Sequence, residues 1–232
     1  MSHELRYYEA INEALAEEME RDERVILFGT DVGKAGHVFV ATKGLQQRFG
    51  PHRVRDTPIS ELGMVGAAVG AAMAGMRPVV DVLFMDFLPL ALDQLLNQAS
   101  KIRYMTAGGF HVPMTLLTLC GAGKENGPQH SQNLEAWLGG IPGITVAMPA
   151  TPFDMKASMK AAIRSEDPAV VVQSLGLWHA RGEVGDADLV AEIGKARIVR
   201  QGKDATLITV GRMIEVGEKA ATALAGEGID LE

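Results

Sequence analysis

Short apolar runs alternate with amphipathic segments along most of the chain, and this alternation constrains the fold more than any other feature. Five runs are long and apolar enough to be buried strands, at residues 25–29, 78–83, 113–119, 144–149 and 168–173. Between them apolar residues recur at helical spacing, as at Tyr8, Ile11, Leu15 and Met19. Because strands that alternate with helices form a mostly parallel sheet with helices on both faces, the sequence predicts an α/β fold.

The carboxyl-terminal part of the sequence predicts the start of a second domain. Residues 176–192 lack clear periodicity and are expected to form a linker. Beyond it we expect a strand at 204–211, a helix at 212–228 and then the beginning of another strand. We therefore assign residues 1–185 to the first domain and 186–232 to a linker and the start of a second α/β domain. Since a strand–helix–strand unit cannot bury both faces of its sheet, we expect the sequence to be a fragment.

The composition excludes several classes of function. The net charge is −7 and no run of Lys or Arg is long enough to follow phosphates, so we expect no nucleic-acid partner. The uncharged stretch at residues 62–76 has only 15 residues, mostly Gly and Ala, whereas a membrane span needs about 20. We predict instead a buried helix in which Gly66, Gly70 and Ala74 let another backbone approach closely. The charged, amphipathic amino terminus is no secretion signal, and the single cysteine, Cys120, fits a reducing compartment, so we expect a cytoplasmic protein without a membrane partner.

Glu61 is the first candidate for chemistry. It follows the end of a predicted strand in the segment DTPISELG and precedes the helix of small residues. Ligands of parallel sheets bind at the carboxyl ends of strands, and a carboxyl group among apolar residues holds its proton more readily than one in water. Such a group can exchange a proton with a ligand near neutral pH. The alternative is that Glu61 simply occupies the first turn of a helix, where the helix dipole favours an acid.

Two aromatic residues and a histidine follow later strands. Phe84 and Phe87 flank Asp86 and either clamp a planar ring or belong to the ordinary core. His130 lies in the polar loop GAGKENGPQHSQ, where it either transfers protons or is simply solvated. Cys120 ends an apolar run, so we expect it to be buried and inert. The sequence shows no phosphate-binding loop, no dinucleotide-binding fingerprint and no metal-ligand spacing among its histidines.

Several long blocks, taken together, resemble one family from about Arg6 to the end of the chain. The blocks are RVRDTPISELGMVGAAVGAAMAGMRPVV, LFMDFLPLALDQLLNQASKIRYM, GPQHSQNLEAW, PGITVAMPATPFDMKA and AAIRSEDPAVVV. Their order and spacing are similar to those of the β subunits of 2-oxo-acid dehydrogenases, which act on pyruvate, branched-chain 2-oxo acids or acetoin. Ordered blocks of this length are far more specific than any short motif.

The resemblance implies a pyrimidine-binding domain of thiamine-diphosphate enzymes, followed by the start of a transketolase-type carboxyl-terminal domain. In this family the cofactor lies between two chains, and an α subunit holds the diphosphate and magnesium through a GDG…N motif that this chain lacks. The resemblance assigns Glu61 to the glutamate that bonds the aminopyrimidine ring and activates the cofactor. It assigns Phe84 and Phe87 to the wall around that ring, and His130 to the reacting centre, near substrate and lipoyl group.

The resemblance also implies an oxidoreductase activity and an assembly. We expect oxidative decarboxylation of a small 2-oxo acid and acyl transfer to lipoyl groups of a separate acyltransferase core, by an α2β2 heterotetramer. Backbone carbonyls of Ala162, Ile163 and Asp167 resemble a monovalent-cation site, so potassium is a further expected cofactor.

Four positions depart from the family pattern and keep alternatives open. An acid usually follows the first strand where Thr30 stands, and an arginine is usual where Leu117 stands. The pair Gln173-Ser174 replaces the usual Glu-His or Glu-Asn. These changes leave the substrate undecided. An acetoin-cleaving or transketolase-like relative is one alternative, and a catalytically silent subunit that only organises a complex is another.

Overall fold

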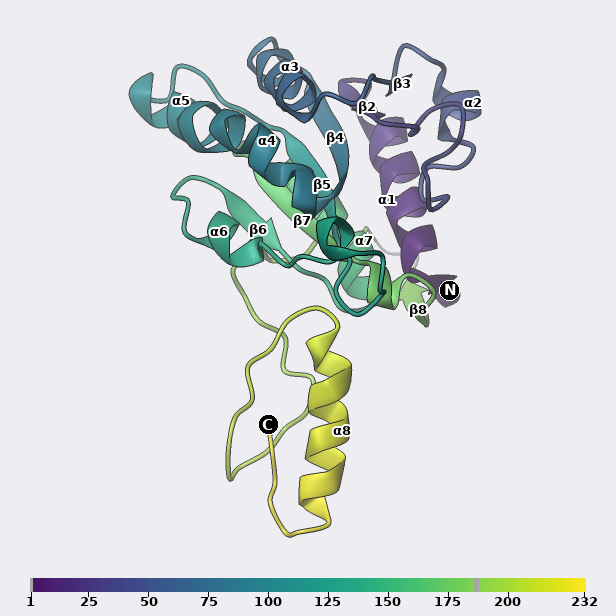
Figure 1. The fold of residues 1–232 in the computed structure, drawn as a ribbon, viewed down its shortest axis with the longest axis vertical. Helices are drawn as coiled ribbons and strands as arrows, with labels where there is room; N and C mark the ends of the chain where they lie inside the picture. Colours follow the sequence, from purple (N-terminus) through teal and green to yellow (C-terminus); the bar gives the residue numbers. More distant parts are fainter. Residues whose placement is uncertain (1, 186–187) are drawn as a thin grey trace.

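The computed structural model describes residues 2–185 and 188–232, and a six-stranded sheet lies at its centre (Figure 1). The strands have the order β3-β2-β4-β5-β7-β6, and every neighbouring pair is parallel. Their bounds are β2 (Val25–Gly29), β3 (Val54–Asp56), β4 (Arg77–Phe84), β5 (Thr115–Cys120), β6 (Thr145–Ala147) and β7 (Ala169–Ser174). The predicted α/β fold with a parallel sheet is confirmed.

Helices cover both faces of this sheet (Figure 1). The helical segments are α1 (Tyr7–Arg21), α2 (Leu45–Phe49), α3 (Glu61–Met73), η1 (Met85–Phe87), α4 (Leu88–Asp93), η2 (Gln94–Ala99), α5 (Ser100–Met105), η3 (Pro128–His130), α6 (Glu135–Gly139), α7 (Pro152–Arg164), η4 (Leu175–Leu177) and α8 (Met213–Ala225). On one face α1 and α7 pack against Leu27 and Val171. On the other, α3, α4 and α5 pack against Val80 and Val172.

Hydrogen bonds at the amino ends of α1 and α7 define where these two helices begin. The Thr151 Oγ1 atom accepts a hydrogen bond from the Asp154 N–H at 3.1 Å, and Pro152 occupies the first turn of α7. At the start of α1 the Glu9 carboxylate accepts from the Arg6 N–H at 2.7 Å. These bonds satisfy amide groups that have no partner within the helix, so both helices begin at defined residues.

From β2 the chain first adds β3 at the edge of the sheet and then crosses back to the other side of β2 to form β4. Strand β3 lies on one side of β2 and β4 on the other. In parallel sheets, ligand sites form at the carboxyl ends of strands next to such a reversal. Glu61 follows β3 and Phe84 closes β4, so both residues lie at this edge of the sheet.

The predicted linker at residues 176–192 is wrong for part of its length. Residues 181–185 form a strand, β8 (Arg181–Gly185), that pairs antiparallel with β1 (Ser2–Arg6). The partner strand lies at the opposite end of the domain sequence, so no local periodicity reveals the pairing. The rest of the predicted linker includes residues 186–187, which lie outside the described part of the chain.

The helix of small residues is buried on one face only, which corrects the prediction of a buried helix. Val65 and Ala68 of α3 are fully buried. A Cβ atom on Gly66 would lie 3.3 Å from the Gln94 Oε1 atom, whereas one on Gly70 would meet nothing within 4 Å. Gly66 therefore packs against the Gln94 side chain and Gly70 faces open space, so at neither glycine does another backbone of the described chain approach closely as predicted. Within residues 2–185 and 188–232, no helix is long and apolar enough to cross a bilayer.

Two other helical predictions are confirmed with changes. The continuous helix expected at 88–105 is present, but its middle, η2, is π-helical. In the carboxyl-terminal part α8 forms as predicted. The strands expected beside α8 are reduced to one isolated parallel bridge between Ala205 and Leu231. This part of the chain lies apart from the main sheet in Figure 1, and its Ile208 side chain is 86% exposed. A strand pair without further strands has little apolar contact to stabilise it.

Ion pairs join α1 to α7. The Lys156 Nζ atom, on a side chain that is 1% exposed, lies 2.5 Å from Glu13 and 2.7 Å from Glu17. The Lys160 Nζ atom lies 2.6 Å from Glu17. Burial raises the pKa of Glu17, but the hydrogen bonds from the two lysines outweigh it, and the net effect lowers the pKa. Glu17 therefore binds its proton less tightly in the folded chain than in the unfolded chain.

We predict that Glu17→Gln destabilises the chain at pH 7 and that this difference disappears in acid. A lowered folded-state pKa contributes stability above the unfolded-state pKa and loses it as the pH falls through the folded-state pKa. Because Glu17 is more than one-third exposed, the effect at pH 7 should not exceed about 1 kcal/mol. Urea unfolding of the two proteins at pH 7 and pH 3 measures it, and an unchanged difference at both pH values contradicts the assignment.

Candidate active site

Three of the residues predicted from the sequence meet at the carboxyl edge of the sheet. The His130 ring stands edge-on to the Phe84 ring, with centroids 4.9 Å apart at 84°, and to the Phe87 ring at 5.4 Å and 87°. Phe84 is buried, whereas Phe87 and His130 are half-buried. The rings come from the end of β4, from η1 and from η3, so the fold brings together segments that lie far apart in the sequence.

Backbone hydrogen bonds attach the segment after His130 to η1. The Asp86 Oδ1 atom accepts from the Ser131 N–H at 3.3 Å and from the Gln132 N–H at 3.2 Å. The Met85 Sδ atom accepts from the Leu134 N–H at 3.0 Å. The Asp86 Oδ2 and Ser131 Oγ atoms are buried and have no hydrogen-bond partner within the described residues. Asp86 therefore positions the His130 loop, while polar atoms beside it keep unused hydrogen-bonding capacity.

Gly121 determines how closely the same loop approaches β5. A Cβ atom on this residue would lie 1.9 Å from the His130 carbonyl oxygen and 3.1 Å from the Phe84 ring. No side chain fits at such distances, so the residue after β5 must be glycine for His130 to reach the phenylalanine rings.

Glu61 is the first residue of α3 and is 7% exposed. Among the residues that the structure describes, none forms a hydrogen bond or ion pair with its carboxylate. Glu61 occupies a first helical turn and also lies at the carboxyl edge of the sheet, so its position does not decide between the two interpretations made from the sequence. Its carboxylate oxygens are not among the fully buried unpaired atoms, so the group is open to a ligand or to another chain.

The other acid of the DTPISELG segment has a structural role. The Asp56 carboxylate accepts from the Gly33 N–H at 2.6 Å and from the Lys34 N–H at 3.0 Å, and so holds the loop after β2. Thr30 is half-buried at the start of that loop, and Leu117 is fully buried in the core.

The Gln173 side chain, 1% exposed, has no partner for either amide atom among the described residues. A buried amide without hydrogen bonds is unfavourable. The glutamine that replaces the usual acid therefore keeps two amide atoms, Nε2 and Oε1, that form no hydrogen bond within the described chain. Cys120 is buried as predicted, and burial raises the pKa of its thiol to about 11, so the thiol is protonated near neutral pH.

Sequence reasoning missed a group of aromatic residues behind Phe84. The Phe39 ring stands edge-on to Phe84, with centroids 5.9 Å apart at 83°. Phe39 also contacts Trp178 at 5.7 Å, and His37 stacks on Trp178 at 6.0 Å. His37 and Phe39 lie in the loop between β2 and α2, and no spacing in the sequence relates them to Phe84 or Trp178.

The carbonyl oxygens predicted to bind potassium already accept hydrogen bonds. The Ala162 oxygen accepts from the Ser165 N–H at 3.2 Å, the Ile163 oxygen from Arg77 Nη1 at 3.0 Å, and the Asp167 oxygen from Ser165 Oγ at 2.8 Å. Each of these carbonyl oxygens therefore has one of its two lone pairs engaged within the chain. In residues 2–185 and 188–232 there is also no group of three or more His, Cys, Asp or Glu side chains that could hold a metal ion.

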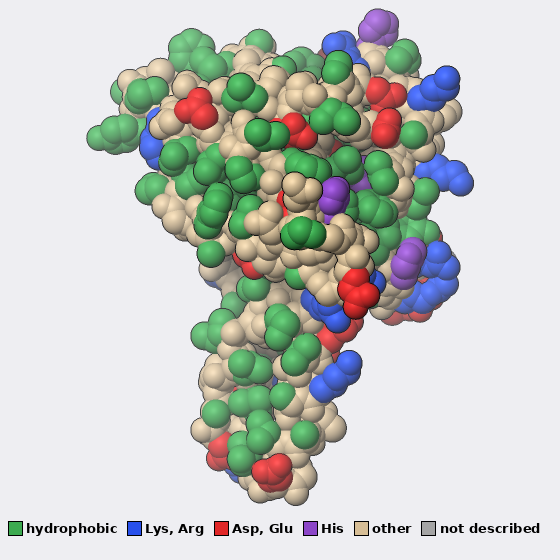
Figure 2. Space-filling view, viewed as in Figure 1, with side chains coloured by type: hydrophobic (Ala, Val, Ile, Leu, Met, Phe, Trp, Pro, Cys, Tyr) green, Lys and Arg blue, Asp and Glu red, His purple; other side chains and the backbone are tan. Residues whose placement is uncertain are grey.

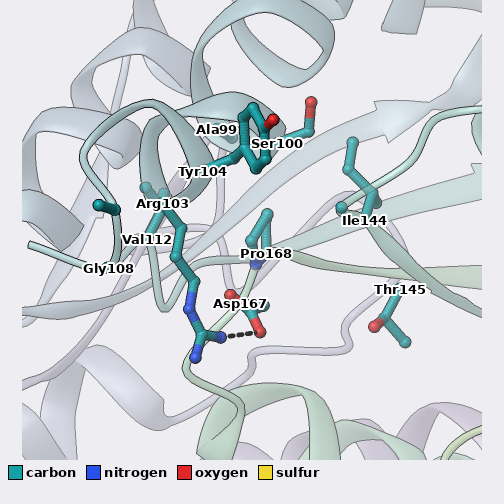
Figure 3. A pocket seen from close by; sticks show the side chains of 12 residues that line it. Ala99, Ser100, Arg103, Tyr104, Gly108, Val112, Ile144, Thr145, Asp167 and Pro168 are labelled. Atoms are coloured by element: carbon teal, nitrogen blue, oxygen red, sulfur yellow. Dashed lines mark hydrogen bonds and ion pairs between the residues drawn. The ribbon is translucent and has the colours of Figure 1, made fainter. Parts of the chain in front are cut away.

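A cavity of about 890 Å³, whose lining Figure 3 shows, includes none of Glu61, Phe84, Phe87 and His130. Its lining includes Arg103, Tyr104, Thr145 and Asp167, and Arg103 forms an ion pair with Asp167 across it. Thr145 begins β6 and Asp167 precedes β7, so the cavity lies at the amino ends of strands, opposite Phe84 and His130. Since ligands of such sheets bind at the carboxyl ends, size alone does not make this cavity the active site.

Family models match nearly the whole chain. Residues 3–178 match the pyrimidine-binding domain of transketolase, and residues 194–232 match the transketolase C-terminal domain. The chain is 42% identical to the 2-oxoisovalerate dehydrogenase subunit beta of Bacillus subtilis, over 97% of this chain and 69% of the relative. It is 40% identical to the chloroplastic pyruvate dehydrogenase E1 component subunit beta-2 of Arabidopsis thaliana, over 99% of this chain and 57% of that relative.

A third relative carries a different activity in its name. The beta subunit of acetoin:2,6-dichlorophenolindophenol oxidoreductase from Cupriavidus necator is 42% identical, over 100% of this chain and 71% of the relative. The chain thus spans between 57% and 71% of the length of these three relatives.

Solved structures show the same fold at lower identity. A split-gene transketolase described as an inactive beta4 tetramer has a TM-score of 0.78 at 22% identity, over 98% of this chain and 69% of that one. A transketolase from Pichia stipitis has a TM-score of 0.72 at 18% identity, over 99% of this chain and 34% of that one. The fold is therefore that of a transketolase-type pyrimidine-binding domain. Within that class, the chain belongs to the family of β subunits of thiamine-diphosphate-dependent 2-oxo-acid dehydrogenases.

We predict that Gly121→Ala displaces His130 from the two phenylalanine rings, because the added methyl group cannot coexist with the His130 carbonyl. Ring-proton resonances of His130, which the neighbouring rings shift, should move toward those of an exposed histidine in NMR spectra of the 232-residue chain. The matched control is Gly70→Ala, which adds a methyl group in open space within a helix. That change should stabilise the chain by about 0.5–1 kcal/mol and leave the His130 resonances in place. If the His130 resonances of Gly121→Ala stay unmoved, the claim that Gly121 allows His130 to reach the phenylalanine rings is contradicted.

Proposed function

We propose that this chain is the β subunit of a 2-oxo-acid dehydrogenase and supplies one half of a thiamine-diphosphate site. The observation that carries the proposal is the set of rings at the carboxyl edge of the sheet, Phe84, Phe87 and His130, with the unpartnered carboxyl group of Glu61 at the same edge. Aromatic side chains favour a planar heterocycle, and a carboxyl group beside it can share a proton with a ring nitrogen. The buried, unpaired Asp86 Oδ2 and Ser131 Oγ atoms fit a polar ligand better than an apolar one.

Each residue has a role in this proposal. Glu61 hydrogen-bonds the aminopyrimidine ring and exchanges a proton with it. Phe84 and Phe87 contact the ring and exclude water from it, and His130 handles the substrate and the transfer of the acyl group to a lipoyl group. The bound cofactor supplies the electron sink that the loss of CO2 requires.

The proposal includes partners and a division of the chain. An α subunit would hold the diphosphate and magnesium in an α2β2 heterotetramer, and a lipoyl acyltransferase core would accept the acyl group. The exposed small-residue face of α3 around Gly70 suits close packing by another subunit. Residues 1–185 would form the pyrimidine-binding domain and 186–232 the linker and the start of the C-terminal domain, in the cytoplasm. Potassium at the oxygens of Ala162, Ile163 and Asp167 stays a prediction, and no part of the proposed reaction depends on it.

An acetoin-cleaving enzyme is the second candidate function. The Cupriavidus necator relative, named for acetoin, has the same 42% identity as the relative named for 2-oxoisovalerate. Both activities would use the same Glu61 and the same rings, so they differ in substrate and not in the half-site. A transketolase-like relative shares the fold. A silent subunit, suggested by Thr30 and Leu117, would bind no cofactor productively.

We predict that Glu61→Gln lowers cofactor activation by a factor of about 10²–10⁴, because the amide cannot exchange a proton with the pyrimidine ring. The measurements are hydrogen–deuterium exchange at the thiazolium C2 and CO2 release from pyruvate and branched 2-oxo acids. Both use the β chain assembled with a partner that carries the GDG…N motif. The matched control is Glu227→Gln, on an exposed residue after α8, which should leave both rates unchanged.

The outcomes separate the candidates. CO2 release that requires both chains and Glu61 supports the dehydrogenase. Acetaldehyde from acetoin, without CO2 release from any 2-oxo acid, supports the second candidate. Equal rates with Glu61 and with its Gln variant contradict the proposed role of this residue.

A further inference from the structure

His37 is a buried histidine that the proposed reaction does not use. It lies in the loop between β2 and α2, is 2% exposed, and adopts a left-handed backbone conformation with φ of 74°. Its ring stacks on Trp178, with centroids 6.0 Å apart at 25°. A bulky residue rarely adopts this conformation unless its surroundings hold it there.

Both ring nitrogens of His37 face specific groups. The Nδ1 atom accepts a hydrogen bond from the Phe39 N–H at 3.1 Å. Because an amide N–H can only donate, Nδ1 carries no proton, and the ring proton therefore lies on Nε2. The Nε2 atom lies 3.4 Å from the Asp81 Oδ2 atom, is buried, and forms no hydrogen bond with any described residue. His37 thus spans the distance from its own loop to β4.

Asp81 is held in place for this contact. It is 2% exposed, and its Oδ1 atom accepts from the Leu83 N–H at 2.8 Å. Its neighbours across the sheet are Gly29 on β2 and Leu117 on β5. Gly29 has no side chain and that of Leu117 is apolar, so neither offers the carboxylate a charged partner. The neutral His37 ring lies beside the Asp81 carboxylate, and in the described part of the chain no Lys or Arg forms an ion pair with Asp81.

Phe39 connects this pair to the candidate site. Its N–H is bound by His37, and its carbonyl oxygen accepts from Trp178 Nε1 at 3.0 Å. With its backbone fixed on both sides, the Phe39 ring stands edge-on to Phe84 at 5.9 Å, and Phe84 stands edge-on to His130 at 4.9 Å. A continuous row of contacts therefore runs from His37 to the rings proposed to bind the cofactor.

We propose that His37 is a positioning residue that fixes Phe39 against Phe84 and so sets the wall that meets the pyrimidine ring. The hydrogen bond from the Phe39 N–H to Nδ1 performs this function, and the negative charge of the Asp81 carboxylate, 3.4 Å from Nε2, favours the tautomer with its proton on Nε2. The part of the inference that concerns cofactor binding rests on the proposed function. The positioning of Phe84 and His130 does not.

Two substitutions distinguish the contact made by Nδ1 from the contact made by Nε2. His37→Asn keeps an oxygen at the place of Nδ1, where it can accept from the Phe39 N–H, and Asn tolerates the left-handed backbone. His37→Gln places its amide at the distance of Nε2, facing Asp81, and removes the acceptor for Phe39. The control is His52→Gln, because His52 is exposed and lies outside this row.

The first readout is NMR of the 232-residue chain with labelled Phe and His. We expect His37→Gln to shift the ring resonances of Phe84 and His130, and His37→Asn and His52→Gln to leave them near their wild-type positions. Wild-type Nδ1 should show the nitrogen shift of an unprotonated imidazole nitrogen. Equal shifts in the Asn and Gln variants, or a protonated Nδ1, would overturn the inference.

The second readout is calorimetric binding of thiamine diphosphate to the chain assembled with its GDG…N partner. We expect affinity about tenfold weaker in His37→Gln than in His37→Asn, the value of one lost hydrogen bond. Equal affinities of these variants contradict the link to the cofactor. If wild-type chains bind no cofactor while the NMR shifts occur as expected, the proposed function fails and the positioning of the rings by His37 stands.

Discussion

The contact between Gly121 and the His130 carbonyl is the constraint on which the candidate site depends. The backbone after β5 passes so close to η3 that only a hydrogen atom fits between them. The Asp86 carboxylate then binds the two amides that follow His130 and joins the same loop to η1. The loop that follows β5 and the segment of β4 and η1, distant in the sequence, are thereby held together at one edge of the sheet.

The two faces of the sheet contribute differently to that edge. The face covered by α1 and α7 is closed by ion pairs and contains Phe39 and Trp178 behind Phe84. The other face carries α3, which brings Glu61 to the edge and leaves its small residues partly uncovered. Hydrophobic side chains are frequent on the visible face of the molecule, over the main body and along the carboxyl-terminal part (Figure 2). The site therefore lies between a face that is closed within the chain and a face available to another chain.

The sequence predicted the parallel sheet because buried strands show as continuous apolar runs. It also predicted the edge to which Glu61, Phe84 and His130 belong, since parallel strands place their carboxyl ends together. It did not reveal β8, whose partner β1 lies at the far end of the domain, nor the exposed side of α3, because small residues look alike whether buried or not. His37 was missed because its significance comes from Asp81 and Trp178, which only tertiary structure brings near. The structure gives the positions of Glu61, Phe84, Phe87 and His130, whereas their roles toward the cofactor stay predictions.

A crystal structure of this chain assembled with its GDG…N partner and thiamine diphosphate tests the central claim most directly. The account predicts that the aminopyrimidine ring contacts Phe84 and Phe87 and lies within hydrogen-bonding distance of the Glu61 carboxyl group, at about 2.6–3.2 Å. A cofactor bound elsewhere, for example in the cavity beside Arg103 and Asp167, or bound with Glu61 facing solvent, would contradict it.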